Sequence, residues 1–276
     1  MKPCDICLEE TCEGRHDCHC DTCSLKDECY RKLHPTIRIT NKCTQECGHC
    51  CFESSPKSNR MMSVETAKQI AQFIKANDVY SLNLMGGEFF CNPDWFEIYS
   101  HLISAAKYAR LVTNGDWVNN LKVKTQLATL VSLFGKKIYF CISKDIWHTN
   151  KNVDAAKEYL EEIGAIVRVA TEEQTTKQSI VPVGRAWGQF IGGIYDMMGC
   201  YCHNPENMYT FLIDEMGQIF KCAFGVWYYA DVDEYLDGGF HAKFKDYNSK
   251  FYKCFLPSCN SCYSYARNHD VTVKPD

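Results

Sequence analysis

Apolar residues recur along the middle of the chain with two different periods. Ile37 and Ile39 alternate with polar residues at 36, 38 and 40, and this period of two predicts a half-buried strand. From Ser63, which suits a helix N-cap, apolar residues recur every three or four positions as far as Ile74 and predict an amphipathic helix. The same periods predict later elements in this order: strand 81–85, a helix opening at Asn92-Pro93, strand 111–113, helix 117–134, strand 138–142, helix 153–163 and strand 165–170.

This alternation of strands and helices predicts an α/β fold. Repeated βα units of this length form a parallel sheet with covering helices, either open or curled into a barrel. Only about ten residues (171–180) follow the last predicted strand before Ile180-Val181-Pro182, too few for a regular crossover helix. We therefore expect a partial barrel rather than a closed eight-fold one.

The charge and the cysteine content of the chain indicate which partners and ligands to expect. The net charge of -4 would repel a phosphate backbone, so we do not expect nucleic acid as a partner. The chain starts without a signal-peptide pattern and holds no stretch apolar enough for a membrane span, so we expect a cytoplasmic protein without a membrane partner. Thiols stay reduced in that compartment, so the 19 cysteines predict metal ligands, for zinc or for iron–sulfur clusters.

The central cysteines form a C-x3-C-x2-C run directly after the first predicted strand. The run consists of Cys43, Cys47 and Cys50. Three thiolates on one short loop can hold three irons of a cubane cluster and leave the fourth iron without a protein ligand. An open position of this kind is what substrate chemistry requires, whereas a structural metal site is closed. The run therefore predicts a catalytic metal centre.

Two glycine-containing turns follow the next two predicted strands. Gly86-Gly87-Glu88 places two residues without side chains beside a carboxylate, and Thr113-Asn114-Gly115 combines a turn with a polar side chain. Glycine lets the backbone approach a neighbouring group closely. Because the C-terminal ends of parallel strands meet at one mouth, we expect both turns to lie beside the cysteine run.

With the cysteine run and both turns, roughly residues 35–196 resemble the radical S-adenosylmethionine (radical SAM) superfamily. The resemblance implies a catalytic 4Fe–4S cluster on Cys43, Cys47 and Cys50, with S-adenosylmethionine (AdoMet) chelating the fourth iron. One-electron reduction then gives a 5′-deoxyadenosyl radical that abstracts hydrogen from a substrate. A partial (β/α)6-type barrel and an electron donor such as flavodoxin or ferredoxin are also implied.

The resemblance assigns roles around the cofactor as well. It places Gly86, Gly87 and Glu88 at the methionyl amine and Asn114 near the cofactor. His49 stands where the family usually has a larger aromatic residue that packs on the adenine, and an imidazole can also stack there. Cys51 lies outside the family pattern and is treated as a non-ligand.

Polar residues of the predicted strands indicate a ligand cavity. If leucines and isoleucines face the helices, the lumen receives Arg38, Thr40, Asn83, Tyr139, Cys141, Ser143 and Arg168. Ser143 begins a polar segment, Ser143-Lys144-Asp145, that resembles one common in the family. Arg168, or Arg185 in the segment 182–186, is predicted to bind a carboxylate; arginines exposed at strand edges are the alternative. Ser143 and Arg168 thus join the candidate cofactor-binding residues.

A later group of cysteines predicts a second metal centre near the C-terminus. Residues 212–220 predict a β-hairpin that turns at Met216-Gly217. The surrounding region resembles the SPASM/Twitch extension of radical SAM enzymes, which implies an auxiliary 4Fe–4S cluster; a four-cysteine zinc site is the alternative. The assigned ligands are Cys202, Cys222, Cys259 and Cys262, with Cys200 and Cys254 as spares or substitutes.

The N-terminal cysteines predict a further metal-binding segment. Cys4-x2-Cys7 and Cys20-x2-Cys23 have a spacing that zinc knuckles use. Cys20, Cys23 and Cys29 equally resemble part of the SPASM pattern, and we favour iron–sulfur over zinc there. Because residues 1–34 hold few apolar side chains, the segment needs a metal to fold.

The expected organisation is a metal-binding segment at 1–34, a partial barrel at 35–196 and an auxiliary iron–sulfur domain at 197–276. The expected function is radical chemistry on a peptide or protein side chain, by an oxidoreductase or peptide-modifying enzyme. A small-molecule radical dehydrogenase is the alternative. A non-catalytic iron–sulfur or zinc protein that transfers electrons or binds partners is an alternative of another class, but it would favour a closed fourth ligand.

Overall fold

The computed structural model describes residues 33–145, 147–149, 151–170, 185, 210–221 and 228–244. Both expected auxiliary metal sites therefore lie outside the described residues: Cys20, Cys23 and Cys29, and also Cys202, Cys222, Cys259 and Cys262. The expected domain boundary at residue 196 and the short stretch 171–180 lie outside them too.

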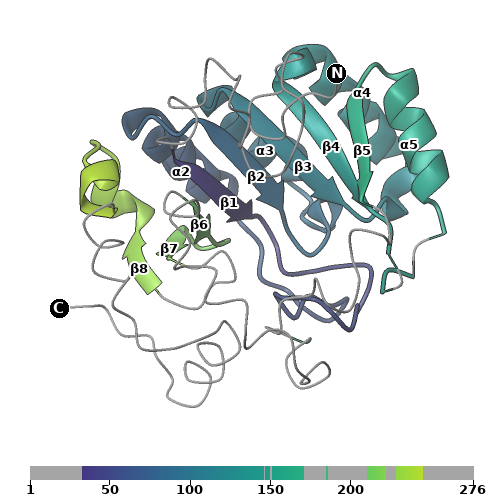
Figure 1. Cartoon of the computed structure of the whole chain (residues 1–276), viewed down its shortest axis with the longest axis horizontal. Helices are drawn as coiled ribbons and strands as arrows, with labels where there is room; N and C mark the ends of the chain where they lie inside the picture. Colours follow the sequence, from purple (N-terminus) through teal and green to yellow (C-terminus); the bar gives the residue numbers. More distant parts are fainter. Residues whose placement is uncertain are drawn as a thin grey trace, which may run out of the picture.

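One mixed sheet with helices along one face organises the described chain (Figure 1). The strands and helices are β1 (His34–Arg38), α2 (Val64–Ala76), β2 (Ser81–Met85), α3 (Trp95–Ala105), β3 (Tyr108–Thr113), α4 (Leu121–Phe134), β4 (Ile138–Ser143), α5 (Val153–Glu162), β5 (Ile166–Ala170), β6 (Thr210–Ile213), β7 (Gln218–Phe220) and β8 (Tyr228–Asp231). The strand order is β5-β4-β3-β2-β1-β6-β7-β8. All neighbours from β5 to β6 pair in parallel, which confirms the predicted parallel α/β sheet.

Local signals place most element ends where the sequence predicts them. The Ser63 hydroxyl accepts a hydrogen bond from the Thr66 amide at 3.0 Å and caps α2. Gly135 follows α4 with φ +48°, a backbone angle at which a side chain would be strained. β3 begins three residues earlier than predicted, at Tyr108, because residues 108–111 pair with β2 and residues 109–113 pair with β4.

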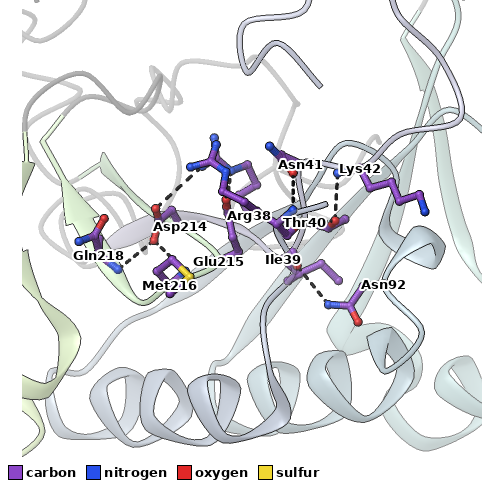
Figure 2. A network of polar contacts seen from close by, with 11 residues as sticks. Arg38, Ile39, Thr40, Asn41, Lys42, Asn92, Asp214, Glu215, Met216 and Gln218 are labelled. Atoms are coloured by element: carbon purple, nitrogen blue, oxygen red, sulfur yellow. Dashed lines mark hydrogen bonds and ion pairs between the residues drawn. The ribbon is translucent and has the colours of Figure 1, made fainter. Parts of the chain in front are cut away.

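The predicted start of α3 at Asn92-Pro93 is wrong by two to three residues. The buried Asn92 amide group donates to the carbonyls of Ile39 and Met62, at 3.2 and 2.9 Å, and its oxygen accepts from the Asp94 amide. These bonds fix Asn92 outside the helix, which begins at Trp95. Figure 2 shows Asn92 reaching the main chain just after β1.

One face of the sheet is apolar and the other carries polar side chains, as the period of two predicts. Ile37, Leu82, Leu111 and Ile142 belong to the hydrophobic core with the covering helices. On the opposite face the predicted Asn83 bonds to its strand neighbours: it donates to Thr36 Oγ1 at 3.2 Å, and its oxygen accepts from Arg110 Nε at 2.7 Å. Arg110 is a polar residue of this face that the sequence analysis missed.

The predicted hairpin at 212–220 is confirmed, and it extends the same sheet. β6 pairs antiparallel with β7 around Gly217, whose φ is +83°, and β6 also pairs in parallel with β1. Its turn supplies the acidic partners of Arg38: Glu215 Oε2 lies 2.7 Å from Arg38 Nε, and Asp214 lies 3.9 Å from Arg38 Nη2 (Figure 2). Arg38, predicted to line a ligand cavity, is thus neutralised by the hairpin.

The hairpin turn makes a second ion pair. Glu215 also lies 2.9 Å from Arg60 Nε, so the hairpin turn contacts the segment that leads from β1 to α2.

Within the residues that the structure describes, no helix is long and apolar enough to cross a membrane.

Candidate active site

The three central cysteines lie on the long loop that joins β1 to α2, beyond the C-terminal ends of the parallel strands (Figure 1). Main-chain hydrogen bonds hold the base of this loop, from the Ile39 amide to Met85 and from the Met62 amide to Ile39. Cys43 is buried, and Cys47 and Cys50 are half-buried. The mouth predicted from parallel topology is therefore where the cysteines lie.

Burial and neighbouring charges disfavour ionisation of the Cys43 and Cys47 thiols. Burial raises the pKa of Cys43 to about 12, and negative charge on Glu88, Cys47 and Cys50 adds to the shift. Burial likewise raises the pKa of Cys47 to about 11, with Cys50 and Asp145 adding to it and Arg185 opposing it. Three thiolates here need a cation to neutralise them. This donor set fits three irons of a 4Fe–4S cluster.

Polar hydrogens also reach two of the sulfur atoms. The Ser54 amide donates to Cys50 Sγ at 3.3 Å, and Asn114 Nδ2 donates to Cys43 Sγ at 3.8 Å. Hydrogen bonds to ligating sulfur atoms help set the reduction potential of an iron–sulfur cluster. These two contacts are further reason to regard the thiols as cluster ligands.

Gly87 packs directly against the cysteine loop. Its amide donates to the Thr40 carbonyl at 2.7 Å, and the next amide, that of Glu88, donates to the Lys42 carbonyl at 2.9 Å. A Cβ atom on Gly87 would lie 2.2 Å from the Lys42 oxygen and 2.9 Å from the Cys43 Cβ. Glycine is required at 87 because the loop comes this close.

Glu88 joins the end of β2 to the end of β3. Its carboxylate accepts from Thr113 Oγ1 at 2.8 Å and from the Asn114 amide at 2.6 Å. The side chain is buried, and this burial raises the pKa of Glu88 to about 8 although both hydrogen bonds favour the ionised form. The two turns singled out in the sequence are therefore in direct contact.

Asn114 extends this contact to the cysteine loop. Its amide nitrogen donates to Thr44 Oγ1 at 3.0 Å, and its oxygen accepts from the Asp116 amide at 2.9 Å. Asp116 Oδ2 in turn accepts from Thr44 Oγ1 at 2.5 Å and from Gln45 Nε2 at 3.0 Å. Gln45 and Asp116 were not predicted as site residues, although Gln45 lies inside the cysteine run and Asp116 follows the Thr-Asn-Gly turn.

His49 faces polar and aromatic residues that follow β4. Its Nε2 lies 3.8 Å from Asp145 Oδ2, which also lies 2.9 Å from His148 Nδ1. The His49 ring is 5.0 Å from the His148 ring and 6.0 Å from the Trp147 ring, between centroids. Burial lowers the pKa of His49, although Asp145 opposes this, so its imidazole is neutral at pH 7.

An unsatisfied atom marks this part of the site. His49 Nδ1 is buried and has no hydrogen-bond partner among the described residues. A buried polar atom of this kind is costly unless a ligand or water satisfies it. This is consistent with a cofactor that contacts His49. The sequence singled out Asp145 only as part of the polar segment 143–145, and it gave no signal for His148.

Ser143 and Arg168, the remaining two predicted cofactor residues, lie at different depths in the sheet. Ser143 is the last residue of β4, at the mouth of the sheet. Arg168 is the central residue of β5 and is level with Cys141, so its backbone is set back from the strand end. Their roles as cofactor ligands stay predictions.

Arg185 contacts the main chain of the cysteine loop through its side chain and its own amide. Nη1 donates to the Cys47 carbonyl and Nη2 to the Ser54 carbonyl, both at 2.6 Å. The Arg185 amide donates to the Cys50 carbonyl at 2.9 Å. The cysteine loop thus uses two of the five guanidinium N–H donors, and the carboxylate-binding role predicted for Arg168 or Arg185 stays a prediction.

These features define an α/β protein whose parallel strands present a three-thiolate loop, a glycine turn and a buried carboxylate at one mouth. Residues 37–140 match the family model of the Radical SAM superfamily. The matched segment includes the cysteine run and both glycine-containing turns, the residues on which the resemblance to this superfamily rests.

Several curated proteins resemble the chain in sequence. The antilisterial bacteriocin subtilosin biosynthesis protein AlbA of Bacillus subtilis is 31% identical over 127 residues, 46% of this chain and 27% of AlbA. The putative peptide biosynthesis protein YydG of B. subtilis is 29% identical over 116 residues, 41% of this chain and 36% of YydG. A probable GTP 3′,8-cyclase of Saccharolobus islandicus is 30% identical over 138 residues, 48% of this chain and 43% of that protein. Each similarity thus spans less than half of either protein.

Solved structures share the fold. Native anSMEcpe with bound AdoMet aligns with 86% of this chain and 95% of its own, with a TM-score of 0.52 and 12% sequence identity. The same protein with bound AdoMet and the Cp18Cys peptide aligns with a TM-score of 0.51 and 11% identity over the same shares of the two chains. At this level of identity the likeness shows a common fold.

Proposed function

We propose that this chain is a radical SAM enzyme in which Cys43, Cys47 and Cys50 bind a 4Fe–4S cluster. The observation that carries this proposal is the placement of three free thiols, one buried and two half-buried, on a single loop that packs against Gly87 and Glu88. No fourth thiol belongs to the family run, so one iron is left for AdoMet.

When bound, the cluster and AdoMet supply a 5′-deoxyadenosyl radical that removes a hydrogen atom from the substrate. The chain's own residues bind and orient the cofactor. The Gly87 and Glu88 amides hold this turn against the cysteine loop, and the carbonyl oxygens of Gly86 and Gly87 would accept hydrogen bonds from the methionyl ammonium. The neutral His49 ring, positioned by Asp145, packs on the adenine.

The proposed substrate is a peptide or a protein side chain. AlbA and YydG support this, since their descriptions concern a bacteriocin and a peptide. We further propose an auxiliary iron–sulfur cluster on Cys202, Cys222, Cys259 and Cys262, a metal site on Cys20, Cys23 and Cys29, and a flavodoxin-like or ferredoxin-like electron donor.

Hydrogen transfer tests the substrate class. Cluster-loaded protein would be incubated anaerobically with AdoMet, dithionite and a uniformly deuterated peptide mixture. Deuterium in the 5′-deoxyadenosine is expected, since the radical takes hydrogen from the peptide. A product that stays unlabelled with every peptide, while the protein still cleaves AdoMet, would contradict a peptide substrate.

A small-molecule substrate is the second candidate, favoured by the similarity to probable GTP 3′,8-cyclases. GTP serves as the probe in the same assay. Consumption of GTP that requires AdoMet and the three cysteines would support this candidate. No loss of GTP, with active AdoMet cleavage, would remove GTP as the substrate.

A further inference from the structure

Arg185 contacts the cysteine loop at three points although it lies more than 130 residues further along the chain. Its guanidinium bridges the carbonyls of Cys47 and Ser54, and its own amide bonds to Cys50. The three accepting carbonyls flank and include the third cysteine of the run. Arg185 therefore restrains the part of the loop that carries two of the three sulfur ligands.

The two carbonyl contacts of the Arg185 side chain suit an arginine better than a lysine. A planar fork with two terminal nitrogens can reach two carbonyls at once, whereas a lysine ammonium is a single point charge. Hydrogen bonds with an ionised donor are roughly twice as strong as neutral ones. The Arg185 side chain is also largely shielded, at 19% exposure, so solvent screens its charge only in part.

The charge of Arg185 acts on the ligands and not chiefly on a carboxylate. Its distance to Glu46 Oε1 is 3.9 Å, and the Glu46 side chain is 62% exposed, which makes this a weak ion pair. The guanidinium lies 2.6 Å from the carbonyl of Cys47, so its positive charge is close to a residue that would hold the cluster. A cation at this position favours added negative charge on a cluster bound there.

We propose that Arg185 is a positioning residue that clamps the cysteine loop around the cluster and raises the cluster's reduction potential. This inference relies on the proposed function only in taking the loop to hold a 4Fe–4S cluster. The relevant step is the addition of one electron from a low-potential reductant, which makes the cluster more negative. Nearby charge and hydrogen bonds to the ligands are established means of setting such a potential.

Two variants separate the clamp from the charge. Arg185→Gln removes the charge and the fork, whereas Arg185→Lys keeps the charge and loses the fork. Arg110→Gln is the matched control, because Arg110 is another partly buried arginine, bonded to Asn83 on β2. Each reconstituted protein is measured without AdoMet turnover, by the rate of iron loss to a chelator and by a redox titration followed by electron paramagnetic resonance.

Arg185→Gln is expected to lower the ratio of reduced to oxidised cluster at a fixed potential about tenfold, which equals a fall of about 59 mV for one electron. Arg185→Lys is expected to keep the wild-type potential. Both variants are expected to lose iron about ten times faster than wild type, the usual effect of removing a group that orients ligands. Arg110→Gln should match wild type in both measurements.

Each remaining outcome overturns the inference. An unchanged potential in Arg185→Gln would rule out the electrostatic role, and unchanged iron loss in both variants would rule out the clamp. Either result leaves the proposed function standing, because wild type still binds its cluster. If wild type held no more iron than the triple Cys→Ala variant at 43, 47 and 50, the proposed function would fail together with the inference. If Arg185→Gln does not fold, Arg185→Lys tests the inference: iron loss faster than in wild type at an unchanged potential supports it, and iron loss at the wild-type rate contradicts it.

Discussion

The carboxylate of Glu88 accepts a 2.6 Å hydrogen bond from the main-chain amide of Asn114. This contact ties the end of β2 to the end of β3, and Asn114 continues it to Thr44 on the cysteine loop. Three motifs that are far apart in the sequence thus form one hydrogen-bonded unit. The consequences of this unit can be measured in the cluster-free protein as well as in the loaded enzyme.

Glu88 should make the cluster-free protein less stable as the pH rises. Burial raises its folded-state pKa from 4.5 to about 8, so folding favours the protonated carboxyl. The stability from this group is present below about pH 4.5 and is lost as pH rises through 8. Urea unfolding of Glu88→Gln between pH 5 and 8.5 should show a smaller fall in stability than wild type. The exposed Glu65→Gln serves as control, and equal pH dependence in all three proteins would contradict the buried environment.

Replacing Gly87 should disrupt the cysteine loop more than replacing Gly86. An added Cβ at 87 would lie 2.2 Å from a backbone oxygen, whereas at 86 the nearest atoms are 3.0 Å away. After identical reconstitution, Gly87→Ala is expected to retain less than half of the wild-type iron and Gly86→Ala clearly more. The iron content per chain, measured by a colorimetric assay, checks this order. Full loading of Gly87→Ala would show that the loop can shift without cost.

Glu215 should be important for stability because it neutralises Arg38 in a buried position. Glu215→Gln leaves Arg38 with Asp214 at 3.9 Å as its remaining carboxylate among the described residues. Removing one partner of a buried pair costs about 3–5 kcal/mol. The control Glu161→Gln breaks an exposed pair with Lys157 and should cost less than about 1 kcal/mol. Urea unfolding measures both, and equal small losses would contradict the buried network.

His49 should contribute to AdoMet binding through its ring rather than through a charge. His49→Ala is expected to weaken binding roughly fivefold to tenfold, because an aromatic contact of this kind contributes about 1 kcal/mol. His49→Phe keeps a ring and should stay within about threefold of wild type. Equilibrium dialysis of the loaded protein with AdoMet gives the dissociation constants. A loss in the Phe variant equal to that in the Ala variant would assign the polar atoms of His49 the main role, because both variants lack them.

The features predicted correctly from the sequence depend on local physics or on topology. The Ser63 cap and the glycine after α4 act within one turn of a helix, and the period of two is visible in β2 without its partners. The clustering of Cys43, Glu88 and Asn114 followed from the rule that parallel strands end at one mouth. These predictions therefore needed no knowledge of the side-chain packing.

The missed features are long-range contacts between single side chains. Arg38 looked like a cavity residue because its acidic partners lie about 177 positions away in the chain. The contacts of Arg185 with the cysteine loop were missed because carbonyl acceptors leave no pattern in a sequence. Asn92 looked like a helix cap because its type and the following proline fit that role, whereas its bonds go to Ile39 and Met62.

The most direct test of the account is the formation of 5′-deoxyadenosine by anaerobically reconstituted protein with AdoMet and dithionite. The account predicts product from wild type and from Cys51→Ala, whose cysteine lies outside the run, and none above background from single alanine variants of Cys43, Cys47 and Cys50. Product from any of these three variants would contradict the central claim. No product from a fully loaded wild type, with or without added peptide, would also contradict it and would favour an electron-transfer protein.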